Sequence, residues 1–260
     1  MLDLCHKTVL VTGASRGIGA VTAETLSRAG ASVILHYGQG RTEAEALADR
    51  LNQWAIAAAL PQRCWTLSVD LADPQGPKRL WEGAIALCPE IDVVVNNAAV
   101  MPAAGITDPW EVWTEAWHLT LQVNLVAVAD LCRLAIQHFQ TRSQGILINV
   151  ASRAAFRGDG PDFMHYAASK GGVVALTRSI ARGFAKDQVL AYAIAPGFVH
   201  TDRIEQVMQA QGAEYVTADI PMGTPAPPQD IANMIAFLAT GAVPHATGST
   251  FDINGASYVR

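Results

Sequence analysis

Charged residues are scarce in this sequence. Only 16% of the 260 residues are charged, whereas an average soluble domain has about 25%, and half of the chain is hydrophobic. Such a balance excludes intrinsic disorder, which has the opposite composition. The net charge of −5 at pH 7 argues against nucleic acid as a partner, because nucleic acid attracts basic domains. The composition therefore indicates a folded domain with a large core.

Long uninterrupted apolar runs are also missing. The best stretches, such as residues 189–199, contain proline or glycine and are shorter than the ~20 residues that cross a bilayer. The sequence does not open with a basic segment followed by an apolar one, so no secretion signal is expected. These features predict a cytoplasmic protein with no membrane span.

Cysteines are few and dispersed. Cys5, Cys64, Cys88 and Cys132 have no metal-ligand spacing, so we expect buried free thiols and no metal site. No repeat, low-complexity tract or proline-rich linker divides the chain, and the Gly/Pro clusters fall where connecting turns belong. We expect a single domain over residues 1–260.

What the sequence does contain is an alternation of two kinds of segment. Short runs rich in Val, Ile and Leu barely alternate in polarity, as expected of strands buried on both faces of a parallel sheet. Between them lie amphipathic stretches long enough for helices. The expected strands are 8–11, 32–37, 64–69, 91–95, 145–150, 189–195 and 249–253, and the expected helices are about 17–29, 42–58, 76–88, 111–140, 166–185 and 228–240. This order predicts an α/β, doubly wound Rossmann fold with a mostly parallel seven-stranded sheet.

One interval breaks this alternation. Residues 200–228 hold a helix-like piece at 205–211 and irregular proline-containing chain, but no strand. A long excursion near the carboxyl end of a strand is typical of a lid or a binding loop. We therefore expect a substrate lid at about 200–228.

A glycine-rich turn follows the first expected strand. Residues 13–19 read GASRGIG and run into a helix, so backbone N–H groups and the positive helix N-terminus could bind a phosphate. Gly13 would permit the turn, Gly17 would permit close approach, and Gly19 would let the helix pack on the strand. The position of this turn at the first strand–helix junction predicts a dinucleotide site.

The same residues match a second motif. Residues 13–17 fit G-x-S-x-G, the nucleophile elbow of serine hydrolases, which also needs a strand–turn–helix setting. The turn follows the very first strand, so no earlier strand-to-helix loop exists to supply the second oxyanion-hole N–H. A hydrolase is therefore the less favoured alternative.

The second expected strand lacks the acid that is typical of NAD sites. An Asp or Glu about 20 residues after the glycines usually holds the ribose hydroxyls of NAD, but residues 36–41 read HYGQGR. Arg16 and Arg41 could pair with a 2′-phosphate, and His36 or Gly38 would line its approach. Arg41 could equally be a solvated side chain at a helix start. We predict NADP(H), with NAD(H) less favoured.

Two residues of one expected helix could perform acid–base chemistry. Tyr166 and Lys170 are four residues apart and share a helix face. An ammonium some ~4 Å away would stabilise tyrosinate by ~4 kcal/mol, or about three pKa units, at an effective dielectric of ~20. Such a shift would bring the phenol into working range. Ser152 and the segments 96–99 and 196–197 follow other strands and would meet this pair at the carboxyl edge of the sheet.

Taken together, these motifs resemble the short-chain dehydrogenase/reductase family over Thr8 to Gly255. The pieces that carry the resemblance are TGASRGIG at 12–19, Asp70, NNAA at 96–99, Asn124, Ser152, YAASK at 166–170 and PGFVHT at 196–201. Within that family, the 3-oxoacyl-carrier-protein reductases share the overall pattern.

The resemblance implies a role for each matching residue. Tyr166 would be the general acid in carbonyl reduction or the base in alcohol oxidation, while Lys170 would bind the nicotinamide ribose and lower the pKa of the tyrosine. Ser152 would hold the substrate oxygen, and Asn124 would anchor a water in the proton relay. Besides Tyr166 and Lys170, the expected cofactor-binding residues are Gly13, Ser15, Arg16, Gly17, Ile18, Gly19, His36, Gly38, Arg41, Asp70, Leu71, Asn97, Ala98, Ala99, Pro196, Gly197, Val199 and Thr201.

We therefore expect an NADPH-dependent oxidoreductase that acts on a small carbonyl or secondary-alcohol substrate. The alternatives are an NAD(H)-dependent alcohol dehydrogenase and a non-catalytic dinucleotide-binding regulator, although such a regulator would usually lack the tyrosine or the lysine. The pocket, framed by 100–106, 154–165, Phe198 and 202–224 with Met208, Tyr215 and Met222, would be mostly apolar. This favours a substrate with a hydrophobic body.

Other features bear on partners. A carrier-protein substrate would need a basic rim, to which Arg142, Arg182 and Lys186 could contribute, although the net charge weakens that case. His165 could contact substrate or simply face a neighbouring side chain. The stripe of Trp110, Trp113 and Trp117 favours core or subunit packing over ligand stacking. The long apolar helices predict a homotetramer or homodimer.

Overall fold

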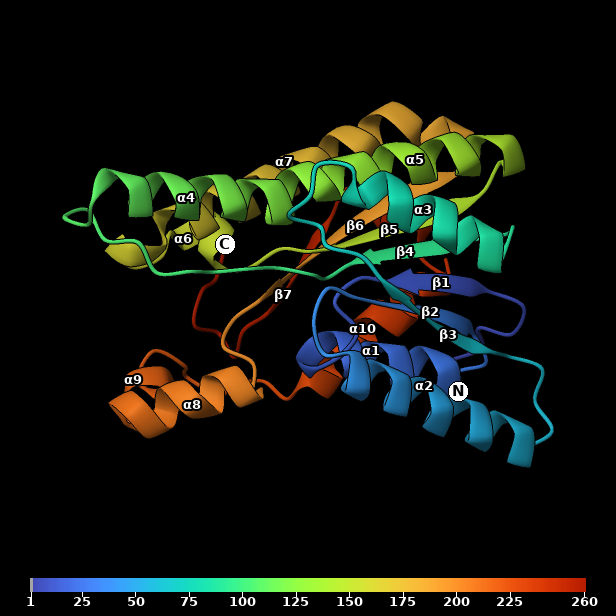
Figure 1. Ribbon diagram of the computed structural model, residues 1–260, viewed down its shortest axis with the longest axis horizontal. Helices are drawn as coiled ribbons and strands as arrows, with labels where there is room; N and C mark the ends of the chain where they lie inside the picture. Colours follow the sequence, from blue (N-terminus) through green and yellow to red (C-terminus); the bar gives the residue numbers. More distant parts are fainter. Residues whose placement is uncertain (1) are drawn as a thin grey trace.

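Seven parallel strands form one sheet in the computed structural model, which describes residues 2–260. The strands are β1 (Thr8–Val11), β2 (Ser32–Tyr37), β3 (Cys64–Ser68), β4 (Val93–Asn96), β5 (Gly145–Val150), β6 (Val189–Pro196) and β7 (Thr250–Ile253). They pair in the order β3-β2-β1-β4-β5-β6-β7 (Figure 1). The chain order reverses between β1 and β4, and ligands bind at such a point in open α/β sheets. The predicted fold class is confirmed.

The strands consist of Val, Ile and Leu because both faces of the sheet are covered. Val9, Leu10 and Val11 of β1 have no exposed surface, and Val9 pairs in register with Val33 of β2 and Val93 of β4. Consecutive residues of one strand point to opposite faces, so full burial of all three requires a helical layer on each side.

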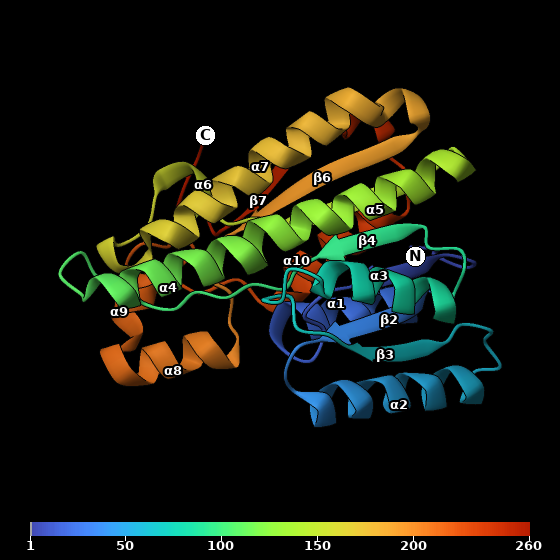
Figure 2. The ribbon, with the colours of Figure 1, turned by 45° about the horizontal axis from the view of Figure 1, so that its top comes forward.

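Two helical layers provide this cover (Figures 1 and 2). On one face, α1, α2 and α10 pack against the sheet, and on the other face α3, α5 and α7 do so. Their bounds are α1 (Gly17–Arg28), α2 (Arg41–Ala57), α3 (Gly76–Leu87), α5 (Ala127–Arg142), α7 (Met164–Phe184) and α10 (Pro228–Ala239). This two-sided arrangement explains the low share of charged residues in the sequence.

The longest helical rod runs beside α7 (Figure 2). It consists of α4 (Trp110–Leu121), a π-helical turn (Gln122–Val126) and α5. Its 33 residues include an 18-residue window with a mean hydropathy of 1.6, so by length and composition it could cross a membrane. The expectation that no stretch reaches that length is therefore wrong, because the polar residues that interrupt the run are few and its mean hydropathy stays high. Half of this window is buried within the fold, as in the core helix of a globular domain.

The interval after β6 has more structure than the sequence predicts. It contains α8 (Asp202–Gln211) and α9 (Ala213–Thr217), and a single β-bridge joins Val199 to Ala226. Figure 1 shows α8 and α9, drawn in orange, standing apart from the sheet beyond the carboxyl end of β6. The short helix α6 (Ala154–Arg157) follows β5 at the same edge.

Three further details differ from the sequence prediction or extend it. β4 begins at Val93 and not at Ile91, whose carbonyl accepts a side-chain hydrogen bond from Arg142 at 2.7 Å. Among the cysteines, all free, only Cys64 and Cys132 are buried, while Cys5 is exposed and Cys88 lies between. Tyr192 is fully buried, and its hydroxyl donates to the Val243 carbonyl at 3.0 Å.

Candidate active site

A cavity of ≈ 230 Å³ opens at the carboxyl ends of the central strands. It brings together Ser152, Tyr166 and Lys170, which come from two separate parts of the chain. Several expected cofactor residues line the same cavity: Ile18, Asn97, Ala99, Pro196, Gly197, Val199 and Thr201. The tertiary structure therefore collects on one wall the motifs that follow β4, β5 and β6.

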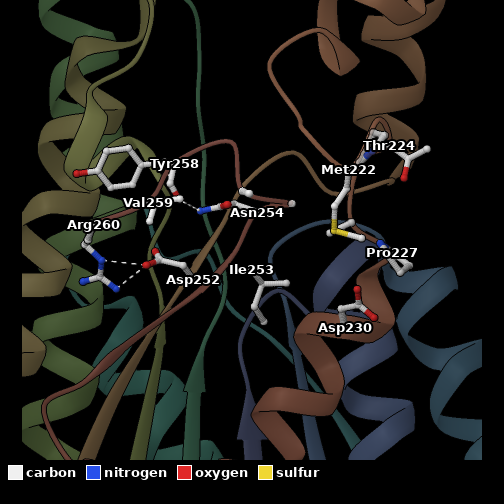
Figure 3. Close-up of a pocket in the computed structure, with 14 residues that line it drawn as sticks. Met222, Thr224, Pro227, Asp230, Asp252, Ile253, Asn254, Tyr258, Val259 and Arg260 are labelled. Carbon is white, nitrogen blue, oxygen red and sulfur yellow. Dashed lines mark hydrogen bonds and ion pairs between the residues drawn. The ribbon is translucent and has the colours of Figure 1, made fainter.

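A second cavity of ≈ 670 Å³ lies near the end of the chain (Figure 3). Met222, Pro227, Asp230 and Asn254 line it, and Arg260 closes one side through an ion pair with Asp252. It contains none of the expected catalytic residues. The smaller cavity is therefore the candidate active site.

Lys170 is deeply buried on α7. Its ammonium donates to the carbonyl of Val150, the last residue of β5, at 2.7 Å. Burial lowers the pKa of Lys170 to about 8. An ammonium has three donors, and this is the one bond it makes among residues 2–260, so two donors face the cavity.

Tyr166 precedes Lys170 by one helical turn, and the Lys170 Nζ lies 5.8 Å from the centre of the phenol ring. Burial raises the pKa of Tyr166, and the negative charge of Asp159 acts in the same direction. The hydroxyl of Ser152 and the charge of Arg203 lower this pKa. The net effect keeps the phenol protonated at neutral pH, in the form that can donate. That Lys170 also lowers the pKa of Tyr166 stays a prediction.

Asn124 lies in the π-helical turn between α4 and α5. Its amide pairs with the backbone of Val100, accepting from the N–H and donating to the carbonyl, both at 2.8 Å. It also donates to the Ser169 hydroxyl at 3.3 Å, which in turn donates to the Tyr166 carbonyl at 2.7 Å. Isolated π-turns are frequent at functional sites. Here the turn places Asn124 between the chain after β4 and the first turns of α7, behind the cavity wall.

The glycine turn after β1 is held by side chains from neighbouring strands. Gly13 has a φ of +64°, which favours glycine. The Asn97 amide donates to the carbonyls of Thr12 and Gly13, at 2.9 and 3.1 Å, and the Thr12 hydroxyl accepts from the Asn97 N–H. A Cβ on Gly19 would lie 2.1 Å from the Gly13 oxygen, so α1 can pack on the turn only with glycine there.

His36 fixes the same turn through hydrogen bonds of its ring. Its Nδ1 accepts from the Gly13 N–H at 3.3 Å, which makes Nε2 the protonated nitrogen that donates to the Val69 carbonyl at 2.9 Å. Burial lowers the pKa of His36 to about 4, so the ring is neutral. Both nitrogens are occupied, and the ring can neither pair with a 2′-phosphate as a cation nor serve Ser15 as a base.

The remaining predicted cofactor residues surround this turn. Arg16 and Arg41 are exposed at the starts of α1 and α2, with Arg41 3.7 Å from Glu45. Asp70 is exposed after β3 and accepts from the Ala72 N–H at 2.9 Å, while Leu71 is buried in the core. Ser15, Gly17, Gly38 and Ala98 complete the rim of this region.

The substrate side of the cavity is more cationic than the sequence predicts. Met101, Phe198 and Ile204 line it as apolar residues, but so do Arg153, Arg157 and Arg203. The expected Met208 and Tyr215 are absent from its lining, and Met222 lines the larger cavity instead. Apolar residues still make up most of the lining, as predicted, but the three arginines were not expected. The only sequence feature that could have indicated this positive charge is Arg153, directly after Ser152. Only the fold shows that Arg153 lines the cavity.

Two other expectations concern residues outside the cavity. His165 is buried, packs edge-on against Trp117 at 6.0 Å and does not line the cavity, so the neighbour-packing alternative describes it. Arg142 cannot form a basic rim around the site, because it binds the Ile91 carbonyl and Asp92 at the amino edge of the sheet. Parallel strands place their two ends on opposite edges, which sets Arg142 far from the carboxyl edge.

Comparison with known proteins identifies the family. A family model described as "Enoyl-(Acyl carrier protein) reductase" matches residues 13–256. The chain is 33% identical to the 3-oxoacyl-[acyl-carrier-protein] reductase of Escherichia coli (strain K12) over 258 residues, covering 97% of this chain and 98% of that protein. The chain belongs to the short-chain dehydrogenase/reductase family. A second reductase of the same name, from Synechocystis sp. (strain ATCC 27184 / PCC 6803 / Kazusa), is 32% identical over 98% of both chains.

Solved structures of this short-chain dehydrogenase/reductase fold have NADP bound. One is a 3-oxoacyl (acyl-carrier-protein) reductase from Agrobacterium tumefaciens C58, with a TM-score of 0.88, 32% identity and coverage of 98% of this chain and 95% of that one. Another, from Beutenbergia cavernae and named for gluconate 5-dehydrogenase, has a TM-score of 0.86 and 31% identity and covers 98% and 97%. The predicted NADP(H) cofactor and oxidoreductase class are confirmed, and the hydrolase alternative is wrong.

Proposed function

We propose that this chain is an NADPH-dependent carbonyl reductase in which Tyr166 gives the proton to the substrate oxygen. One observation supports it above the others: Tyr166, Ser152 and Lys170 face one cavity beside the glycine turn. Run in reverse, the same residues would take a proton from a secondary alcohol.

The residues present fit the cofactor. Two donors of the buried Lys170 ammonium face the cavity, as ribose hydroxyls require, and the glycine turn meets Thr201, another expected cofactor residue, at Gly17. In this proposal Gly13–Gly19 hold the pyrophosphate, Asp70 contacts the adenine, and Asn97–Ala99 with Pro196–Thr201 enclose the nicotinamide. When bound, NADPH supplies the hydride.

The chain's own residues would handle the oxygen and the proton. Ser152 and Tyr166 would both donate hydrogen bonds to the carbonyl oxygen, which fixes its position and polarises it. The raised pKa of Tyr166 keeps its proton available until negative charge develops on that oxygen. Asn124, bonded through Ser169 to the start of α7, would hold a water that returns a proton to the site.

Two finer proposals concern the rest of the chain. Residues 200–228, with α8 and α9, would act as a lid because Thr201, Arg203 and Ile204 line the cavity from that segment. The enzyme would work in the cytoplasm as a homotetramer or homodimer on a small molecule. Relatives are named for 3-oxoacyl-carrier-protein and for gluconate, so the family does not decide between these substrates.

Tyr166→Phe tests the proposed function. Removing the hydroxyl should lower kcat for carbonyl reduction by about 10²–10⁴-fold, the usual contribution of a general acid, while NADPH still binds. The measurement is NADPH absorbance over a carbonyl panel, with fluorescence titration for cofactor binding. Tyr192→Phe is the matched control, since its hydroxyl bonds only to the Val243 carbonyl among the described residues, and it should keep kcat. Full activity in Tyr166→Phe would overturn the proposal.

A further inference from the structure

The cavity next to Ser152 carries unbalanced positive charge. Arg153, Arg157, Arg203 and Lys170 line it, whereas Asp159 is the one carboxylate that does so. In the proposed function Lys170 binds the cofactor ribose, which leaves the three arginines for the substrate. Of these only Arg153 is buried, while Arg157 and Arg203 are exposed, so the cost of burying a charge falls on Arg153.

Asp219, between α9 and the Val199–Ala226 bridge, supplies only part of that compensation. One of its oxygens, Oδ2, accepts from Arg153 at 3.1 Å and also from Arg157. Two guanidinium groups thus share one carboxylate. Counting Asp159 and Asp219 against the four cations leaves two positive charges without an anion.

Arg153 shows the strain of this arrangement. Only 5% of the residue is exposed, and its guanidinium lies 4.6 Å from the centre of the Phe198 ring. Burial lowers the pKa of Arg153, and the nearby charge of Arg157 lowers it further, against the opposing effect of Asp219 and Asp159. An anion entering the cavity would relieve the repulsion between the two arginines.

Arg203 approaches from the lid side. It lies in the first turn of α8, and its Nη2 donates to the Met101 carbonyl at 3.2 Å. No carboxylate pairs with it within residues 2–260. Its charge reaches Tyr166, because it lowers the pKa of that phenol. Arg203 therefore lines the same cavity as Tyr166 and has no carboxylate paired with it among the described residues.

We propose that the substrate is a carbonyl compound bearing a carboxylate, which Arg203 and Arg157 bind while Ser152 and Tyr166 hold the carbonyl. Planar guanidinium groups match a carboxylate with paired hydrogen bonds, and Arg157 and Arg203 line the same cavity as Ser152 and Tyr166. This inference rests on the proposed reductase function.

The test compares acids with neutral partners of the same shape. Acetoacetate and levulinate would be assayed with NADPH beside their methyl esters and the N-acetylcysteamine thioester of acetoacetate. Loss of one charge-assisted contact changes kcat/KM by about 10- to 100-fold, so the acids should exceed their esters by that factor. Arg203→Gln should cut the acid-to-ester ratio by a similar factor, and Arg203→Lys should restore part of it. Arg63→Gln, at the amino edge of the sheet, is the control and should leave the ratio unchanged.

The outcomes separate this inference from the function on which it rests. The inference of a carboxylate-bearing substrate would be overturned if the esters or the thioester were reduced as well as the acids, or if the acid-to-ester ratio were unchanged in Arg203→Gln. Either result would still support the proposed reductase function. If the enzyme reduces none of these acids, esters or the thioester, that result would count against the proposed reductase function. Levulinate binding would then test the carboxylate inference separately. Levulinate should quench the fluorescence of bound NADPH in the wild type and not in Arg203→Gln. Equal binding of levulinate and its methyl ester to the wild type would overturn the carboxylate inference.

Discussion

Histidine 36 shows how one buried side chain can build a binding turn without touching the ligand. Its neutral ring joins the Gly13 N–H to the Val69 carbonyl, and so ties the turn after β1 to the end of β3. These are the two places at which the proposed cofactor phosphates and adenine would bind. We therefore assign His36 a positioning role in place of direct contact.

This role predicts a pH-dependent stability. The pKa of His36 is about 4 in the folded protein against an ordinary value of 6.5, so below pH 6.5 the unfolded chain takes up a proton that the folded one refuses. The free energy of unfolding should fall by about 3 kcal/mol from this group as the pH drops from about 6.5 to 4. Urea unfolding across this range should give a shallower fall for His36→Asn than for wild type. The exposed His245→Asn should match wild type, and identical slopes for all three would contradict the role.

Arg41 carries a prediction about cofactor choice. Its guanidinium is exposed, lies 3.7 Å from the Glu45 carboxylate and is beside the Tyr37 side chain, at the end of β2 where a 2′-phosphate would bind. Arg41→Ala should lower kcat/KM for NADPH by about tenfold or more and leave NADH nearly unchanged, because one charge-assisted contact is lost. Steady-state kinetics with both cofactors decide it. Unchanged kinetics with NADPH would make Arg41 a solvated side chain at a helix start, the alternative that the sequence left open, and equal losses with both cofactors would also contradict the 2′-phosphate contact.

At the scale of elements, one carboxylate joins the proposed lid to the catalytic loop. Asp219 follows α9, whereas Arg153 and Arg157 belong to the segment that starts at Ser152 and forms α6. Arg153 is also fixed through its backbone N–H to the Pro196 carbonyl at 2.9 Å. The chain after β5, the chain after β6 and the lid thus meet at one cluster of charges.

Asp219→Asn should therefore loosen the lid. Breaking a buried pair costs about 3–5 kcal/mol, and we expect about 1–2 kcal/mol here because Asp219 is half exposed and surface pairs contribute little. Thermal unfolding and limited proteolysis within 200–228 would measure the change. Glu214→Gln on α9, at an exposed residue that forms no ion pair within residues 2–260, is the control. Equal protease resistance in both variants would refute the link.

At the scale of the whole molecule, one helical rod leaves apolar surface uncovered. Trp110, Val112 and Val126 are exposed at 73%, 45% and 43%, and all three lie on the α4–α5 rod whose apolar window is only half buried. Apolar surface gathered along one rod indicates an interaction site. A second copy of the chain is the occupant that the predicted homo-oligomer provides.

Val126→Arg should break that oligomer. A buried, unpaired charge at a subunit contact costs several kcal/mol, so light scattering at micromolar concentration should show a dimer or tetramer for wild type and smaller particles for the variant. Ile56→Arg on α2, exposed at 68% and far along the chain from the rod, serves as the matched control. A wild-type monomer, or dissociation in both variants, would contradict the assignment.

The sequence by itself determined the fold class and the family. Runs of Val, Ile and Leu separated by amphipathic stretches placed most strands and helices within two residues of their observed ends, because hydrophobic periodicity is a local property of the chain. The motifs at residues 12–19, 96–99, 152 and 166–170 carry the family pattern for a similar reason, since each needs particular residues at a fixed spacing.

Tertiary structure alone decided which side chains face the cavity and which face the core. No local sequence pattern shows that the His36 ring is hydrogen-bonded to the glycine turn or that Arg142 lies at the opposite edge of the sheet from the site. Nor does one show that three arginines line the candidate cavity. Those facts depend on neighbours far away in sequence, such as Asp219 and Arg153, which are brought together only when β5, β6 and the lid pack. The scarcity of charge noted at the outset also follows from the tertiary structure, because the sheet is buried on both faces.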